Sequence, residues 1–363
     1  MKQLKTRQIC FFFIAFMPIT KFFMLPSVLA ECAYEDMWIS ALLSFFLDFI
    51  TLACLLRVCR LSNTDFFGLL EKNFGKTVAK IIMFLYAVYF ILKAFIPLQE
   101  QKEFVKLSLY INMPTDLFFL PFFLVSFYLC LKPLRVFGRV SDILWFFTLS
   151  GYLLLIFLSI SNVDWTSFLP VGARGITATI KGTYHGLNWW GDCAYALFFI
   201  GNFAHGKKAS TRIILSYLAG GVMVLFAMLF FWGTFTSIAF RQKFAMTELS
   251  KYTTVINNTG RFDYVGILFI LFSCVFGLSL PIYFACLLLN RVFSPKRKWI
   301  ISLIINLILM TSLVVFNQYM NTLTWFFLKY MGIPFLIMGN LLPILTLCLV
   351  QKRRRLQVEN VQA

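Results

Sequence analysis

The sequence predicts an all-α integral membrane protein of about ten transmembrane helices. Of its 363 residues, 60% are hydrophobic and 13% are charged, whereas about a quarter of the residues in a soluble domain are charged. Apolar runs of about 20 residues, the length that spans a bilayer, follow one another with short connectors. Basic residues collect in alternate connectors. We therefore expect a single polytopic membrane domain over residues 1–363, with short tails at 1–8 and 352–363.

Ten ranges meet the requirement for a spanning helix. They are 9–30, 37–56, 78–98, 116–131, 142–160, 187–205, 211–236, 262–289, 299–317 and 332–350. The first and sixth are irregular, the fourth is short, and the eighth is long. Two connectors, at about 161–186 and 240–261, exceed ordinary connector length. Long ordered loops often act as gates or binding surfaces, although a passive external cap is an equal alternative.

The charge distribution predicts the orientation. Most of the 33 lysines and arginines lie on the side of both termini, so the positive-inside rule predicts that both termini are cytoplasmic. The net charge of +18 is dispersed between apolar runs, which argues against nucleic-acid binding, where basic residues form one patch. The nine cysteines lie mostly inside apolar runs without C-x-x-C spacing, which is typical of buried thiols and predicts no disulfide framework.

The first range contains the segment "PITKFFMLP", in which Lys21 lies between Pro18 and Pro26. A charge at mid-bilayer costs several kcal/mol, and proline interrupts helical hydrogen bonding. Unwound backbone at membrane depth is tolerated only where it faces protein or a water-filled cavity. We predict a broken helix that presents Lys21 to a central cavity. The alternative is a lysine that pairs with an internal carboxylate for structural reasons alone.

Asp48, central in the second range, is the obvious carboxylate for Lys21. A buried lysine and aspartate that pair avoid the penalty of an isolated charge. Lys93 in the third range competes for the same aspartate. Two lysines and one central aspartate would leave one cation free for an anionic group such as a ligand carboxylate.

The sixth range opens with "HGLNWWGDCAYALFFIGNFAHG", where glycines such as Gly191 loosen the helix. Asn188, Asp192 and Tyr195 are spaced to lie near one helix face. Broken helices at the first and sixth positions are what an inverted five-plus-five repeat predicts. The alternative is that these glycines only let helices pack closely.

Ser273 and Gly277 in the eighth range supply small groups that could contact a ligand, although small residues are also ordinary at helix contacts in membranes. Catalytic patterns are absent from the sequence, which has no nucleotide-binding loop, G-x-S-x-G or H-E-x-x-H motif. The two histidines, His185 and His205, lie at opposite ends of one range, so a shared metal site is implausible. We expect no enzyme activity, no cofactor and no metal site.

Several segments together resemble one family. They are Arg7-Gln-Ile9, Leu25-Pro-Ser27, "LAECAYEDMWISALL" at 29–43, "FLPVGARG" at 168–175 and "GRFDYVGILFILF" at 260–272. They resemble the B subunit of bacterial spore germinant receptors (the GerAB family), in the amino acid-polyamine-organocation superfamily. The resemblance covers essentially the whole chain.

This resemblance implies a ten-helix, LeuT-like fold with a small-molecule germinant held between helices one, three, six and eight. It also implies a complex with an A subunit and a lipoprotein C subunit in the lipid of the spore inner membrane. The expected ligand site is Thr20, Lys21, Phe22, Lys93, Asn188, Asp192, Tyr195, Ser273 and Gly277, with Asp48 as the buried charge partner. Relatives often have a glycine–serine break in helix one, where this chain has Thr20-Lys21-Phe22.

The leading hypothesis is therefore a germinant-sensing subunit that binds an amino acid or a similar molecule in a mid-membrane cavity and triggers germination. The alternatives are an amino-acid permease that uses the same cavity, and a membrane scaffold in which the buried charges only fix helix packing.

Overall fold

The computed structural model describes residues 4–61, 65–108, 119–203, 206, 208–245, 248–249, 263–345 and 348–349. Its α-helices are α1 (Thr6–Phe16), α2 (Leu25–Ala33), α3 (Met37–Leu61), α4 (Phe66–Ser108), α6 (Leu120–Cys130), α7 (Arg135–Ser159), α8 (Gly175–Gly186), α9 (Ala209–Phe235), α11 (Asp263–Phe293), α12 (Trp299–Val315), α13 (Met320–Phe326) and α14 (Gly332–Leu336). The 3-10 helix η5 (Asp192–Phe198) follows α8.

The described residues contain 6 segments that are long and apolar enough to cross a membrane. Two shorter apolar helices, Leu120–Cys130 and Trp299–Val315, accompany them. The protein is thus helical and multi-pass, while the count of ten crossings and the five-plus-five repeat stay predictions.

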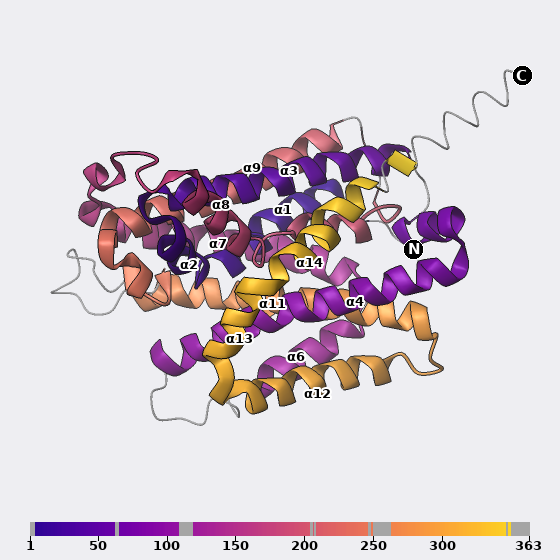
Figure 1. The fold of residues 1–363 in the computed structure, drawn as a ribbon. Coiled ribbons are helices and arrows are strands. Elements are labelled where there is room, and N and C mark those ends of the chain that lie inside the picture. The colour runs from indigo at the N-terminus through magenta and orange to yellow at the C-terminus, as the bar shows by residue number, and fades with distance from the viewer. Residues whose placement is uncertain are drawn as a thin grey trace, which may run out of the picture.

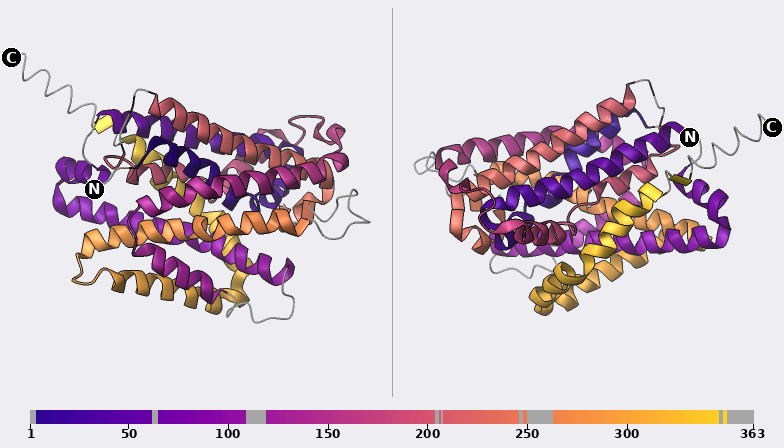
Figure 2. Two further views of the ribbon diagram at one scale, coloured as in Figure 1. Left: turned by 180° about the vertical axis from the view of Figure 1, so that it is seen from behind. Right: turned by 45° about the horizontal axis from the view of Figure 1, so that its top comes forward.

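The long helices lie side by side along one common direction (Figures 1 and 2). Helix α11 packs against both α4 and α7, and α1 packs against α7 and α9. Helices α6 and α12 form one edge, and the α13–α14 segment crosses the bundle obliquely (Figure 1). The first broken helix therefore lies inside the bundle.

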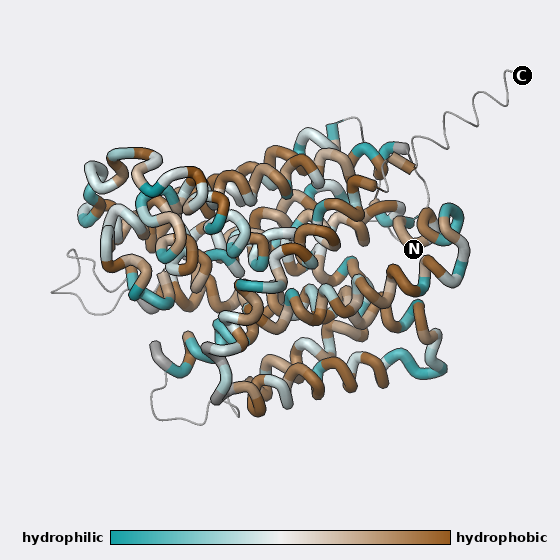
Figure 3. The backbone as a smooth tube through the Cα atoms, viewed as in Figure 1, coloured by the Kyte–Doolittle hydropathy of each residue, from teal (hydrophilic) through white to brown (hydrophobic). Residues whose placement is uncertain are grey.

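Apolar residues cover most of the helix length, while hydrophilic residues gather toward the two ends of the bundle (Figure 3). Large apolar side chains also point outward, including Phe46 (56% exposed), Leu124 (62%) and Ile143 (62%). In a water-soluble protein such an extensive apolar surface would favour aggregation. Lipid removes that penalty, which agrees with a membrane location.

The first spanning segment is broken around Lys21, as predicted. Helix α1 ends at Phe16, a single 3-10 turn covers Ile19–Lys21, and α2 begins at Leu25. Pro26 lies in the first turn of α2, where its missing N–H removes no helical hydrogen bond. Helix α1 itself begins at Thr6.

The sixth predicted range is also irregular, and the helix that leads into it begins earlier than the sequence predicted. Residues 175–186, assigned to an outward loop, form α8, and the chain leaves helical geometry at 187–191 before η5. The segment "GITATIKGTYHG" was missed because it has few large apolar residues. Its small residues instead permit close packing on α3, since a Cβ on Gly182 would lie 2.6 Å from the Ser40 hydroxyl.

Both long connectors contact the rest of the protein where they are described. In the first, the Gly172 N–H donates to the carboxylate of Asp36 at 2.9 Å. In the second, the Ser27 hydroxyl donates to the Gln242 carbonyl at 2.5 Å. Most of the predicted 240–261 connector lies outside the described residues.

Candidate functional site

Lys21 is completely buried, at 0% exposure, in the break between α1 and α2. Its ammonium donates to the Met17 carbonyl at 2.7 Å and contacts the carboxylate of Asp192. The same nitrogen lies 4.8 Å from the ring centre of Trp190. The two broken segments are therefore joined directly by an ion pair.

Lys93 on α4 approaches the same aspartate from another side. Its ammonium donates to the Trp190 carbonyl at 2.6 Å and lies 3.1 Å from Asp192 Oδ1. It also lies 5.8 Å from the ring centre of Tyr195. Asp192 thus uses one carboxylate oxygen for each lysine.

The prediction that Asp48 is the charge partner of Lys21 is wrong. Asp48 Oδ2 instead accepts hydrogen bonds from the backbone N–H groups of Gly191 and Asp192, at 2.7 and 3.1 Å. The hydroxyl of Tyr217 also donates to Oδ2, at 2.9 Å, and the side-chain amide of Asn340 donates to Asp48 Oδ1, at 2.9 Å. The break in the sixth segment frees backbone amides that must find acceptors, and Asp48 lies directly opposite them.

This arrangement also corrects the expected charge balance. Lys21 and Lys93 face two buried carboxylates, Asp192 in direct contact and Asp48 through the backbone of the break. The formal charges of the four side chains sum to zero. The expectation of one spare cation for a ligand carboxylate is therefore wrong for this arrangement.

A small cavity lies beside the ion pairs. Thr20, Lys93, Asn188, Tyr195 and Gly277 line it, from the two breaks, α4 and α11. Its volume of about 10 Å³ holds about one water molecule. Asn188 is 4% exposed, and its carbonyl oxygen has no hydrogen-bond partner in the described part of the chain. The cavity thus presents one cation and one unused acceptor.

Two other predicted ligand residues pack elsewhere. Phe22 stacks on Tyr152 of α7, with ring centres 5.5 Å apart. Ser273 accepts a hydrogen bond of 2.8 Å from the Thr148 hydroxyl, which ties α11 to α7. Neither lines the cavity, and their contacts are those of helix packing.

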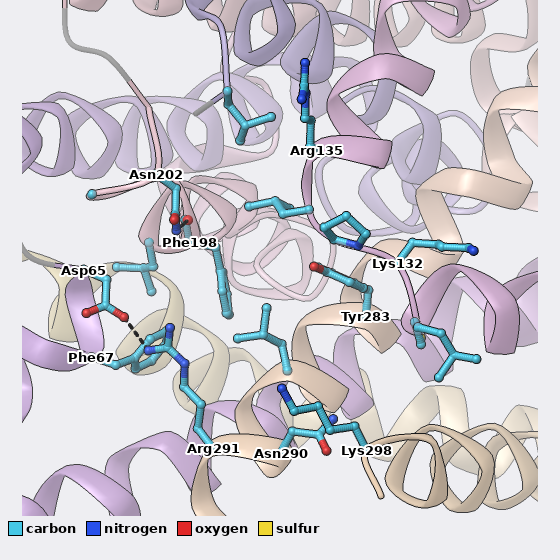
Figure 4. Close-up of a pocket in the computed structure, with 18 residues that line it drawn as sticks. Asp65, Phe67, Lys132, Arg135, Phe198, Asn202, Tyr283, Asn290, Arg291 and Lys298 are labelled. Carbon is cyan, nitrogen blue, oxygen red and sulfur yellow. Dashed lines mark hydrogen bonds and ion pairs between the residues drawn. The ribbon is translucent and has the colours of Figure 1, made fainter. Parts of the chain in front are cut away.

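A much larger cavity, which we call the vestibule, has a volume of about 950 Å³, and Figure 4 shows the side chains that line it. Lys132, Arg135 and Lys298 line it, and Arg291 lines it in an ion pair with Asp65.

Stacked aromatic rings separate the vestibule from the small cavity. Phe198 lines the vestibule and Tyr195 lines the cavity, and both belong to η5. The ring of Phe284 stacks on both, with centres 3.9 Å from Phe198 and 5.5 Å from Tyr195. Phe90 stacks on Tyr195 at 5.8 Å. These rings, which we call the aromatic plug, form a chain of contacts between a residue that lines the vestibule and a residue that lines the cavity.

A family model described as "Spore germination protein" matches residues 3–320. The chain belongs to the spore germination protein family. The search of curated proteins found no significant match to this chain.

Solved structures similar to this spore germination protein are those of a manganese transporter from Eremococcus coleocola. Its complex with an aromatic bis-isothiourea substituted compound has a TM-score of 0.57 and 13% identity, covering 95% of this chain and 75% of that one. A mutant of the same transporter has a TM-score of 0.58 and 13% identity, covering 95% and 76%. The germination protein therefore shares the fold of this transporter, which is of the LeuT-like type.

Within the residues that the structure describes, no group of three or more His, Cys, Asp or Glu side chains is placed to hold a metal ion. His185 Nδ1 lies 2.9 Å from the Leu328 carbonyl oxygen. His205 lies outside the described residues. In this spore germination protein, the carboxylate of Asp192 instead contacts two lysines, and that of Asp48 accepts from backbone amides.

Sequence reasoning missed Trp190, Tyr217 and Asn340, which all contact the buried charges. Asn340 lies in a π-helical segment of the last span, Ile337–Leu341, and such segments are frequent at functional sites. The sequence could have indicated Asn340, because an asparagine inside an apolar run is unusual. It could not have indicated Tyr217, because a tyrosine in a spanning helix is as consistent with packing as with a polar contact.

Proposed function

We propose that this spore germination protein is the germinant-sensing subunit of a spore germinant receptor. In this proposal a small molecule occupies the cavity lined by Thr20, Lys93, Asn188, Tyr195 and Gly277. The observation that carries it is their convergence, from two broken segments and two further helices, on one small cavity. Broken helices that meet near the membrane midplane are where transporters of this fold type hold substrates.

The cavity has room for about one water molecule in this arrangement. A germinant must therefore bind a wider state, and its preference for that state supplies the energy of the switch. The four buried charges sum formally to zero, so a ligand with net charge would leave an uncompensated charge in a medium of low dielectric. A zwitterionic amino acid or a neutral molecule fits this balance better than an anion.

The complex with an A subunit and a lipoprotein C subunit, in the spore inner membrane with cytoplasmic termini, belongs to the same proposal. The change to the wider conformation would alter the contacts of this protein with these two subunits. Genes for the two subunits beside the gene for this protein would favour it.

The experiment is a thermal-shift screen of the purified protein against single amino acids. A ligand that prefers the folded protein raises its apparent melting temperature. Asn188→Ala, which removes the unused acceptor, should abolish the shift, while the matched variant Ser273→Ala outside the cavity should retain it. Loss of the shift in both variants, or its retention in Asn188→Ala, would contradict the cavity as the site.

An amino-acid permease is the second candidate, favoured by the vestibule that reaches the aromatic plug. Uptake of a labelled amino acid into proteoliposomes separates the two functions. Binding without uptake, together with loss of amino-acid-triggered germination in Asn188→Ala spores, supports the receptor. Uptake that Asn188→Ala abolishes would establish the permease. If no ligand changes the melting temperature, the remaining hypothesis is a membrane scaffold in which the buried charges only fix helix packing.

A further inference from the structure

The ammonium of Lys21 lies in a setting built from oxygen atoms. The Met17 carbonyl at the end of half-helix α1 accepts from it at 2.7 Å, and Asp192 at the start of η5 contacts it through its carboxylate. In transporters with broken helices, unwound carbonyls and the carboxyl ends of half-helices coordinate the coupling Na⁺ or H⁺. The donors around Lys21 are of the same kind and in the same type of place.

The ammonium is also fully accommodated in this setting. A lysine has three N–H donors; here the nitrogen contacts two oxygen atoms and lies 4.8 Å from the ring centre of Trp190. Lys21 has no exposed surface. A buried charge persists only when it is paired and hydrogen-bonded, so this position is built for a cation.

Lys93 differs from Lys21 in one respect. It lines the small cavity and can meet a ligand, whereas Lys21 does not line it. Met17, which accepts from Lys21, lies one helical turn before it. The Lys21 ammonium is therefore bound by the broken segment itself and does not face the ligand cavity.

We propose that the Lys21 ammonium occupies a latent site for a monovalent cation and substitutes for a soluble coupling ion. The protein then needs no Na⁺ or K⁺ to hold its two broken segments together. Removing the lysine exposes a site of one carboxylate and one carbonyl that accepts a small monovalent cation. This inference goes beyond the proposed function and does not depend on which germinant binds.

The test compares the wild-type protein with Lys21→Ala by thermal unfolding in detergent. Each protein is measured in chloride salts of Na⁺, K⁺, n-propylammonium and N-methyl-D-glucamine at equal ionic strength. Propylammonium matches the atoms that the substitution deletes. Wild type should melt at one temperature in all four salts. Lys21→Ala should melt lowest in N-methyl-D-glucamine and gain stability saturably with at least one small cation, as site binding requires.

The double variant Lys21→Ala/Asp192→Asn is the control, because it lacks the anionic group of the latent site. Its melting temperature should not depend on the cation. An equal response in the double variant, or no response in Lys21→Ala, would overturn the proposal. If Lys21→Ala cannot be purified in a folded state, the wild-type protein alone still tests the proposal. A saturable rise of its melting temperature with Na⁺ concentration would show that Lys21 does not fill the site. A failed germinant screen would leave these results unaffected.

Discussion

The carboxylate of Asp48 on α3 accepts a hydrogen bond of 2.7 Å from the backbone N–H of Gly191, which lies 143 positions later in the chain. The neighbouring Asp192 N–H donates to the same oxygen. A side chain on an intact helix therefore supplies the acceptor that the broken helix cannot provide for itself. This contact fixes where the break occurs, and with it the position of Asp192 between the two lysines.

Asp48→Asn should destabilise the protein by about 1.5–3 kcal/mol, the range for hydrogen bonds to charged groups. The reason is that an amide NH₂ cannot accept from the donors around it. Equilibrium unfolding in detergent measures the effect. Asp142→Asn is the control, since Asp142 is 21% exposed and pairs with a largely exposed Arg7, a class of ion pair worth up to about 1 kcal/mol. Equal losses would show that the Asp48 contacts are unimportant.

Gly191→Ala should be more destabilising than Gly172→Ala. Both glycines have positive φ, +88° and +81°, a conformation that costs a residue with a Cβ roughly 1–2 kcal/mol. A Cβ at Gly191 would in addition lie 2.7 Å from the Tyr89 hydroxyl, whereas nothing lies within 4 Å at Gly172. The difference in unfolding free energy between the two variants isolates this crowding. Indistinguishable variants would argue against the close packing of the break.

Asp192→Asn should destabilise the protein more than Lys93→Met. The aspartate variant leaves two buried ammonium groups without their carboxylate, while the lysine variant leaves Asp192 with Lys21. Breaking a buried pair costs about 3–5 kcal/mol, so Asp192→Asn should lose at least that much. Thermal unfolding at one pH ranks the variants, and the reverse ranking would contradict the shared role of Asp192.

Phe198→Ala should open the aromatic plug from the vestibule side. The readout is the rate at which a water-soluble thiol reagent modifies Thr20→Cys, a cavity position, in a chain whose nine native cysteines are replaced. The rate should rise when the Phe198 ring is removed, because that ring stacks on Phe284 across the passage. Phe46→Ala, on the outer surface, is the control and should leave the rate unchanged. An unchanged rate in Phe198→Ala would show that the plug does not limit access.

The break around Lys21 was predictable because its signal is local. A lysine and two prolines inside one apolar run conflict with an intact membrane helix whatever the rest of the chain does. The break near Gly191 was predictable for a similar reason, although α8 was not. Its residues are too small and polar to resemble a membrane span, and they are helical because their smallness lets α8 pack against α3.

The pairing of the charges was not predictable in this way. Asp48 and Asp192 are both aspartates inside apolar surroundings, and the sequence offers each of them to Lys21. What separates them is that the backbone N–H groups of the break require an acceptor, and α3 places Asp48 next to them. Asn340, from the last span, completes that set of contacts.

A helical membrane protein with two interrupted helices follows from the residues alone, and five of the residues expected at the ligand site line one small cavity. Hydropathy, proline and glycine act over a few residues, so their consequences can be derived locally. The arrangement of the helices in space was needed to show which carboxylate meets which cation, that Lys21, Lys93, Asp48 and Asp192 sum to zero charge, and that stacked rings lie between the vestibule and the cavity. These relationships join residues far apart in the chain, and packing alone brings them within hydrogen-bonding distance.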